Sequence, residues 1–319
     1  MIKGVIEGFY GPPWTHEQRL DLIRFSAEEG FDTWVHAPKD DPFHRERWRD
    51  PYPDDELTRL RELVGETKRV GVEFAYAIAP GLSIAYDDED DFAALTAKCE
   101  QLRSIGVETV QLLWDDIESR DGASQARVSN RFKRELTQKS PLVICPVGYA
   151  NTENTPYRRS LARELDRDIV VYWTGPEVVS YAIRREELDV AVDRFGGSEL
   201  LIWDNYPVND FAPEKLFLGP LRGRDPRLFD GRCAGLIANG MLQAVPSKLP
   251  LATVADFLRD PHGYDPQASF ERALQKYGVE VLAALGDEKA DVEQPDDLFA
   301  TLALGVDAPT ARALLERLL

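Results

Sequence analysis

The sequence is poor in the residues that most often hold metals or form disulfides. Its 319 residues include 3 cysteines and 4 histidines. Cys99, Cys145 and Cys233 are odd in number and widely spaced, which fits neither a disulfide framework nor a zinc site. The histidines form no HxH or HxxxH pair, although His44 lies close to acidic residues. We therefore expect free, mostly buried thiols, no metal and no cofactor.

Acidic residues outnumber basic ones, 56 to 38, and long apolar runs are absent. The formal net charge of −18 disfavours nucleic acid, anionic membranes and acidic polymers as partners. No apolar run approaches the ~20 residues of a membrane-spanning helix, and the N-terminus lacks the apolar segment of a signal peptide. These features predict a cytoplasmic protein that binds neither nucleic acid nor membrane, and they leave its oligomeric state unknown.

The chain does contain a regular alternation of short β-rich apolar runs and longer helical patterns. The predicted strands are Gly4–Glu7, Thr33–His36, Glu73–Ile78, Thr109–Trp114, Leu142–Cys145, Ile169–Trp173, Leu200–Trp203 and Gly235–Ala238. The predicted helices include Thr15–Glu29, Asp55–Val70, Asp91–Ile105 and Pro176–Arg194. Eight strands alternating with helices favour a (β/α)8 TIM barrel, and the lack of GxGxxG after the first strand argues against a doubly wound sheet. We predict an α/β barrel over residues 1–245 and a short helical C-terminal region over residues 246–319.

Functional side chains of a TIM barrel gather at the carboxyl ends of its strands. Carboxylates, a lysine, amides and aromatic residues follow the predicted strands, a mixture that is typical of a sugar pocket. The candidates are Gly8, Lys39, Asp115, Asp116, Tyr149, Trp203, Asn205, Asp210 and Asn239. Several have a structural alternative: Gly8 could serve a tight turn, Lys39 could pair with a neighbouring aspartate, Trp203 could be core, and Asn239 could be a turn residue.

The pair Asp115-Asp116 is one of six Asp-Asp dipeptides, and its position distinguishes it, because it directly follows the apolar run VQLLW. Burying two carboxylates is costly unless they are hydrogen-bonded or protonated. Side chains alternate along a strand, so both carboxyls reach one pocket only if the chain bends there. Adjacent carboxyls rarely straddle a sugar as acid and nucleophile. They suit a mechanism in which the 2-acetamido carbonyl of the substrate is the nucleophile.

Several long motifs in this chain resemble glycoside hydrolase family 84, which comprises protein O-GlcNAcases and bacterial β-N-acetylglucosaminidases. They occur in family order from residue 4 to about residue 240. The motifs are GVIEGFYGPPWTHEQR, APKDDPFHRERWRDPYP, AIAPGL, WDDIE, ICPVGY, WTGPEVVS, IWDNYPVND and LFLGPLRGR.

The resemblance implies a role for each candidate. Asp115 would orient the acetamido group, and Asp116 would protonate the departing oxygen and then activate water. Tyr149 would donate a hydrogen bond near the reaction centre, and Trp203 would form an apolar wall. The residues that would contact sugar hydroxyls are Gly8, Lys39, Asn205, Asp210 and Asn239.

The expected activity is that of a retaining exo-β-N-acetylglucosaminidase, acting by substrate-assisted catalysis through an oxazoline on β-linked N-acetylglucosamine of a protein or glycan. One alternative is an endo-acting hexosaminidase on a polysaccharide that contains N-acetylglucosamine. Another is a non-catalytic module that binds this sugar. An intact Asp115-Asp116 pair argues against the module, because a binding protein has no need to bury both carboxyls.

Overall fold

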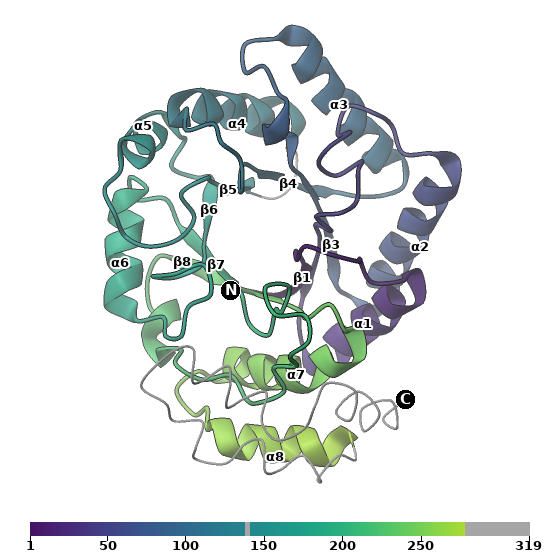
Figure 1. Ribbon diagram of the computed structural model, residues 1–319, viewed down its shortest axis with the longest axis vertical. Helices are drawn as coiled ribbons and strands as arrows, with labels where there is room; N and C mark the ends of the chain where they lie inside the picture. The colour runs from purple at the N-terminus through teal and green to yellow at the C-terminus, as the bar shows by residue number, and fades with distance from the viewer. Residues whose placement is uncertain (138–140, 278–319) are drawn as a thin grey trace.

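A closed barrel of eight parallel strands forms the centre of the protein (Figure 1). The computed structural model describes residues 1–137 and 141–277. Each strand pairs with the next one in sequence, and β8 closes the ring on β1. The predicted TIM barrel is therefore confirmed. The strands are β1 (Ile2–Glu7), β2 (Thr33–His36), β3 (Glu73–Ile78), β4 (Thr109–Leu113), β5 (Val143–Cys145), β6 (Val170–Trp173), β7 (Leu200–Asp204) and β8 (Cys233–Asn239).

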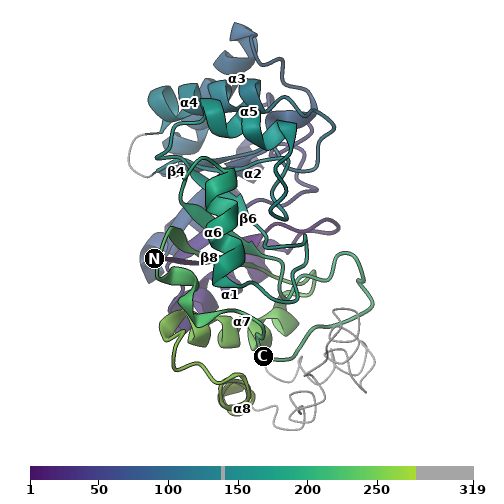
Figure 2. The same ribbon diagram turned by 90° about the vertical axis from the view of Figure 1, so that its left-hand side faces the viewer.

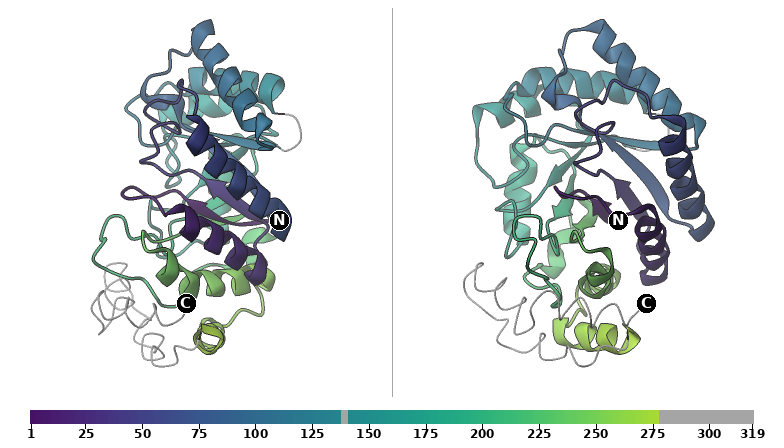
Figure 3. Two further views of the ribbon diagram at one scale, coloured as in Figure 1. Left: turned by 90° about the vertical axis from the view of Figure 1, so that its right-hand side faces the viewer. Right: turned by 45° about the vertical axis from the view of Figure 1, so that its right-hand side comes forward.

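Helices surround the barrel (Figures 1 and 3). In the described part of the chain, the connection from β7 to β8 contains the short 3-10 helix η2 (Pro226–Phe229) instead of an α-helix. Helix α7 (Ala244–Arg259) follows β8 and packs against α1 (His16–Glu29), and α8 (Pro266–Tyr277) lies on the outer side of α7 (Figures 1 and 2). The helices are α1 (His16–Glu29), α2 (Asp54–Val70), α3 (Glu89–Ser104), α4 (Gly122–Leu136), α5 (Pro156–Glu164), α6 (Arg185–Arg194), α7 (Ala244–Arg259) and α8 (Pro266–Tyr277).

The C-terminal boundary at residue 245 stays a prediction. Helix α7 begins at Ala244 and takes its place in the ring beside α1, and the predicted C-terminal region beyond Tyr277 lies outside the described residues. In the described ranges, no helix is long and apolar enough to cross a membrane. All three cysteines are free and buried, as the sequence predicted.

Local signals explain where the first helix begins and ends. The Thr15 side chain accepts a hydrogen bond from the Gln18 backbone, and the Gln18 side chain accepts one from the Thr15 backbone. This capping box satisfies two amides that a helix start leaves unpaired. The helix ends at Gly30, whose φ of 90° lies in the left-handed region that glycine adopts without strain.

The helix predicted over Pro176–Arg194 is wrong in its first half, because α6 begins only at Arg185. Ile183 instead forms a β-bridge with Arg224, and its backbone amide donates to Gly223. The Ser180 hydroxyl donates to the Thr174 carbonyl upstream. These contacts use polar groups that a helix would need, so residues 174–184 form a loop over the barrel rim.

The strands alternate between two apolar layers. One set of side chains fills the barrel interior, so the barrel is a packed core and not a pore. Ile6, Val35, Leu113 and Val143 belong to this interior set. Neighbouring side chains on the same strands point outward and pack under the helices. The two layers hold the strand ends in fixed positions, and those ends carry the site.

Candidate active site

A cavity of about 230 Å³ lies at the carboxyl ends of the strands. This is below the roughly 300–1,000 Å³ of pockets that hold drug-sized ligands, so the cavity suits a ligand the size of one sugar. The structure brings all nine sequence-predicted residues together on its walls. They are Gly8, Lys39, Asp115, Asp116, Tyr149, Trp203, Asn205, Asp210 and Asn239.

The chain bends sharply at the predicted carboxylate pair. Asp116 has a φ of 53°, in the left-handed region that few residues other than glycine adopt. The bend ends the extended path of β4, and both carboxyl groups consequently line the cavity. Asp115 is buried, whereas Asp116 is exposed. The Arg45 guanidinium holds the turn by donating to the backbone carbonyls of Asp115 (3.4 Å) and Asp116 (2.9 Å).

Asp115 has one neutralised oxygen and one free oxygen. Its Oδ2 accepts a hydrogen bond from the Lys39 ammonium, and both side chains are almost fully buried. Lys39 therefore pairs with Asp115, 76 positions away, and not with its neighbours in the sequence. In the described residues the buried Oδ1 has no hydrogen-bond partner. This oxygen can accept a hydrogen bond from a ligand N–H group, and an unpaired buried acceptor favours a ligand that provides one.

Asp116 is held by two tyrosines. The Tyr10 hydroxyl donates to Oδ2 (2.9 Å) and the Tyr149 hydroxyl donates to Oδ1 (2.8 Å). Burial, followed by the negative charge of Asp116, raises the pKa of both tyrosines above its ordinary value. Both hydroxyls therefore remain protonated donors across the neutral range. Sequence reasoning missed Tyr10, although it belongs to the EGFYG motif directly after β1.

Amides and a close packing contact shape the opposite side of the cavity. The Gly8 amide donates to Asn239 Oδ1 (3.1 Å), and Asn239 Nδ2 donates to Asn205 Oδ1 (3.0 Å). A Cβ on Gly8 would lie 2.4 Å from the Trp203 ring, so this position excludes any side chain. Close approach, and not turn geometry, is what requires glycine here. Asp210 accepts a hydrogen bond from the Tyr10 amide (2.9 Å) and completes this wall.

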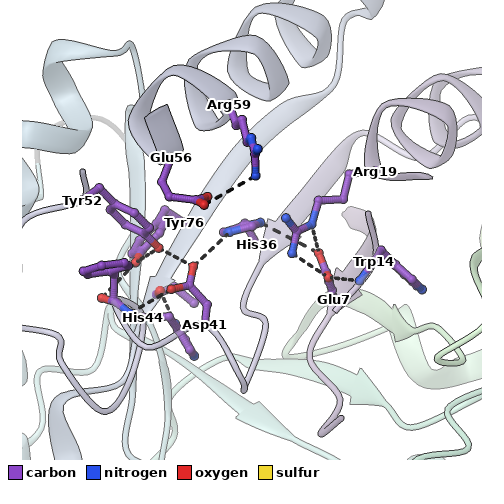
Figure 4. Close-up of polar contacts among 12 residues, drawn as sticks. Glu7, Trp14, Arg19, His36, Asp41, His44, Tyr52, Glu56, Arg59 and Tyr76 are labelled. Atoms are coloured by element: carbon purple, nitrogen blue, oxygen red, sulfur yellow. Dashed lines mark hydrogen bonds and ion pairs between the residues drawn. The ribbon is translucent and has the colours of Figure 1, made fainter. Parts of the chain in front are cut away.

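A buried polar network fixes the loop after β2 (Figure 4). This loop carries Lys39 and Arg45. Asp41 accepts hydrogen bonds from the Tyr52 hydroxyl (2.6 Å) and the Phe43 amide (2.8 Å). Burial alone would raise the pKa of Asp41, but His36 and Tyr52 outweigh it and lower the pKa to about 2. Asp41 is thus ionised at neutral pH and anchors the loop from within.

Two further residues connect this network to neighbouring strands. His44 Nδ1 lies 2.6 Å from the Ala77 carbonyl of β3, and burial together with the Lys39 charge lowers the pKa of His44 to about 3. His44 is therefore neutral and donates through Nδ1. His36 lies between two carboxylates, 4.0 Å from Glu7 and 3.9 Å from Asp41, on the helix side of the barrel (Figure 4). In the described residues, no group of three or more histidine, cysteine or acidic side chains could hold a metal ion.

This chain is similar in sequence and fold to proteins of a known family. A family model described as β-N-acetylglucosaminidase matches residues 3–287. The protein O-GlcNAcases of Mus musculus and Rattus norvegicus are each 33% identical over 275 residues, which is 81% of this chain. A solved mutant of the O-GlcNAc hydrolase from Thermobaculum terrenum superposes with a TM-score of 0.84 at 34% identity and covers 89% of this chain.

The relatives are longer than this chain. It spans 30% of each rodent protein and 64% of the solved Thermobaculum terrenum chain. The similarity covers the whole barrel, with every residue that lines the cavity. The chain belongs to the β-N-acetylglucosaminidase family, glycoside hydrolase family 84.

Proposed function

We propose that this chain is a retaining exo-β-N-acetylglucosaminidase in which the substrate's own acetamido group is the nucleophile. The observation that carries the proposal is the arrangement of Asp115, whose buried Oδ1 is unpaired in the described structure while Lys39 neutralises Oδ2. An N-acetylhexosamine provides an N–H donor beside its anomeric carbon. The unpaired oxygen is a partner for that N–H.

The proposed reaction divides the work between the two aspartates. Asp115 accepts a hydrogen bond from the acetamido N–H, which turns the carbonyl oxygen toward the anomeric carbon. The carbonyl oxygen bonds to that carbon as the bond to the leaving oxygen breaks, and Asp116 gives its proton to the leaving oxygen. The intermediate is a protonated oxazoline, which keeps the acetamido N–H and is therefore positively charged. Its forming charge lies beside the Asp115 carboxylate, a fixed group placed where charge develops.

In the second step Asp116 acts as a base. It takes a proton from water, and the water oxygen bonds to the anomeric carbon as the carbonyl oxygen leaves. Two inversions give a product with the original β configuration. The hydrogen bonds from Tyr10 and Tyr149 hold Asp116 in place through both steps. The small cavity accommodates a single terminal sugar, which supports exo action over cleavage within a polymer.

Replacement of the acid tests this division of roles. We expect Asp116→Asn to lose about 10²–10⁴-fold in kcat/KM on substrates with poor leaving groups, because these need a proton in the transition state. Activated aryl glycosides should lose far less. NMR should also detect the β anomer of N-acetylglucosamine as the first product. An equal loss on both substrate classes, or an initial α product, would contradict the mechanism.

A further inference from the structure

A second hollow adjoins the catalytic cavity. We call it the leaving-group groove; it has a volume of about 780 Å³ and lies between the loops that follow β4, β5 and β6. Tyr149 and Val178 line both the groove and the cavity. Because Tyr149 also donates to Asp116, the groove begins beside the side chain assigned to protonate the leaving oxygen. The part of a substrate beyond that oxygen would extend into it.

A buried arginine fixes the wall of the groove. Arg158 is 1% exposed and donates to the backbone carbonyls of Gly148 (3.0 and 2.6 Å), Ala150 and Glu153 (2.8 Å) and to the Asn151 side chain (3.0 Å). These hydrogen bonds pin residues 148–153 in one conformation. The groove is therefore preformed, which lowers the entropy cost of binding.

The acceptors of Arg158 are all neutral oxygens. In the described part of the chain it has no ion pair, and the exposed Glu153 attracts it only through space. A buried charge without a counter-ion is costly, and its field extends further in a low-dielectric interior than in water. Arg158 therefore places one positive charge directly behind the pinned wall.

A second cation adds to this field. Arg120, which follows β4, is the only charged side chain that lines the groove, and it has no hydrogen bond or ion pair within the described ranges. The acidic residues Glu118 and Glu177 lie in the flanking loops, but neither lines the groove. In a chain of net charge −18, two cations without carboxylate partners at one groove are unusual. They fit an anionic ligand.

We propose that the leaving-group groove binds a peptide segment that carries an acidic side chain, and that Arg120, reinforced by Arg158, selects it. This inference rests on the proposed glycosidase function and specifies its leaving group. A peptide fits better than a second sugar for two reasons. The groove has more than three times the volume of the sugar cavity, and its walls include the apolar side chains of Val147, Pro156 and Val178.

The test compares kcat/KM for two synthetic glycopeptides that carry N-acetylglucosamine on serine and differ only in acidic or neutral flanking residues. We expect the acidic peptide to be preferred at least about fivefold at low salt, and less at high salt, because the attraction is electrostatic. Arg120→Lys should keep part of the preference, and Arg120→Glu should abolish or reverse it. Arg134→Glu, in the last turn of α4 and outside the groove, makes the same change of charge as Arg120→Glu; it is the matched control and should keep the preference.

Three outcomes would overturn the inference. The first is an equal kcat/KM of the wild-type chain for the two glycopeptides. The second is an Arg120→Glu variant that prefers the acidic glycopeptide as strongly as the wild-type chain does. The third is a preference seen only with a disaccharide that bears an acidic second sugar, which would make the occupant carbohydrate. Hydrolysis of an aryl β-N-acetylglucosaminide tests the proposed function separately. If that hydrolysis fails, calorimetric binding of the two glycopeptides still tests the charge preference of the groove.

Discussion

Replacement of Lys39 by methionine removes the ammonium group from the ion pair with Asp115 and keeps most of the side-chain volume. The Lys39 side chain is 1% exposed and the Asp115 side chain 5%. The variant leaves a buried carboxylate without its counter-ion, in addition to the Oδ1 atom that already has no partner. Asp115→Asn creates the opposite case, in which a buried ammonium loses its carboxylate.

The burial of the pair sets the expected magnitude. Loss of one member of a buried ion pair costs about 3–5 kcal/mol of unfolding free energy. The double variant Lys39→Met/Asp115→Asn removes both charges, so we expect it to be more stable than either single variant. Lys133→Met is the control. Its exposed pairs with Asp166 and Asp168 should contribute no more than about 1 kcal/mol.

Urea denaturation followed by circular dichroism measures these differences, provided that the slope of unfolding free energy against urea stays constant. We also expect Lys39→Met to lower kcat/KM on an aryl N-acetylglucosaminide by about 10²–10³-fold, because the orienting carboxylate loses its fixed position. The reasoning would be refuted if the losses of the two single variants simply added in the double variant, because additivity means that the two side chains are not coupled.

Two more predictions concern hydrogen bonds and pH. Tyr10→Phe and Tyr149→Phe each remove one donor to Asp116, and we expect each to lower kcat/KM about tenfold on poor leaving groups, with a smaller loss on activated aryl glycosides. The pKa of His44 is about 3 in the folded protein and ~6.5 in an unfolded chain, so between these values only the unfolded state binds the proton. Stability should be complete above pH 6.5 and fall toward pH 3 by at most about 1.4 kcal/mol per unit. His44→Gln, whose amide can still donate to Ala77, should show a flatter dependence in urea titrations at pH 7.5 and pH 5, and an unchanged slope would contradict this account.

Most of the fold could be predicted because each strand is marked by its own local pattern. All eight predicted runs are strands, with ends that differ by a few residues. The error at Pro176 had a tertiary cause. The sequence from residue 176 to residue 194 is compatible with one helix, but the bridge from Ile183 to Arg224 depends on a segment 41 positions further along the chain. No local pattern contains that information.

The residues that line the site could be predicted from the sequence, but the ion pairs and hydrogen bonds among them could not. The barrel rule and the motifs place Lys39 and Asp115 on one rim, yet their ion pair joins two strands and becomes visible only when the barrel closes. Tyr10 and Arg45 lie within the quoted motifs and could have been proposed from them. Their roles depend on the left-handed turn at Asp116, which the sequence does not reveal.

The hydrogen bonds of Arg158 have a consequence for how relatives with this barrel could diverge. They tie residues 148–153 to α5, while the Asn151 amide donates to the Gly175 carbonyl after β6, so this stretch of the groove wall is held from two sides and meets the cavity through Tyr149. The aspartates and the amides that line the cavity follow other strands. Exchange of the groove wall between homologues, with Tyr149 kept for its hydrogen bond to Asp116, would thus change which glycoconjugate is preferred and leave the chemical step in place. On the proposed function, substrate range and reaction chemistry would then be inherited through largely different residues of the same molecule.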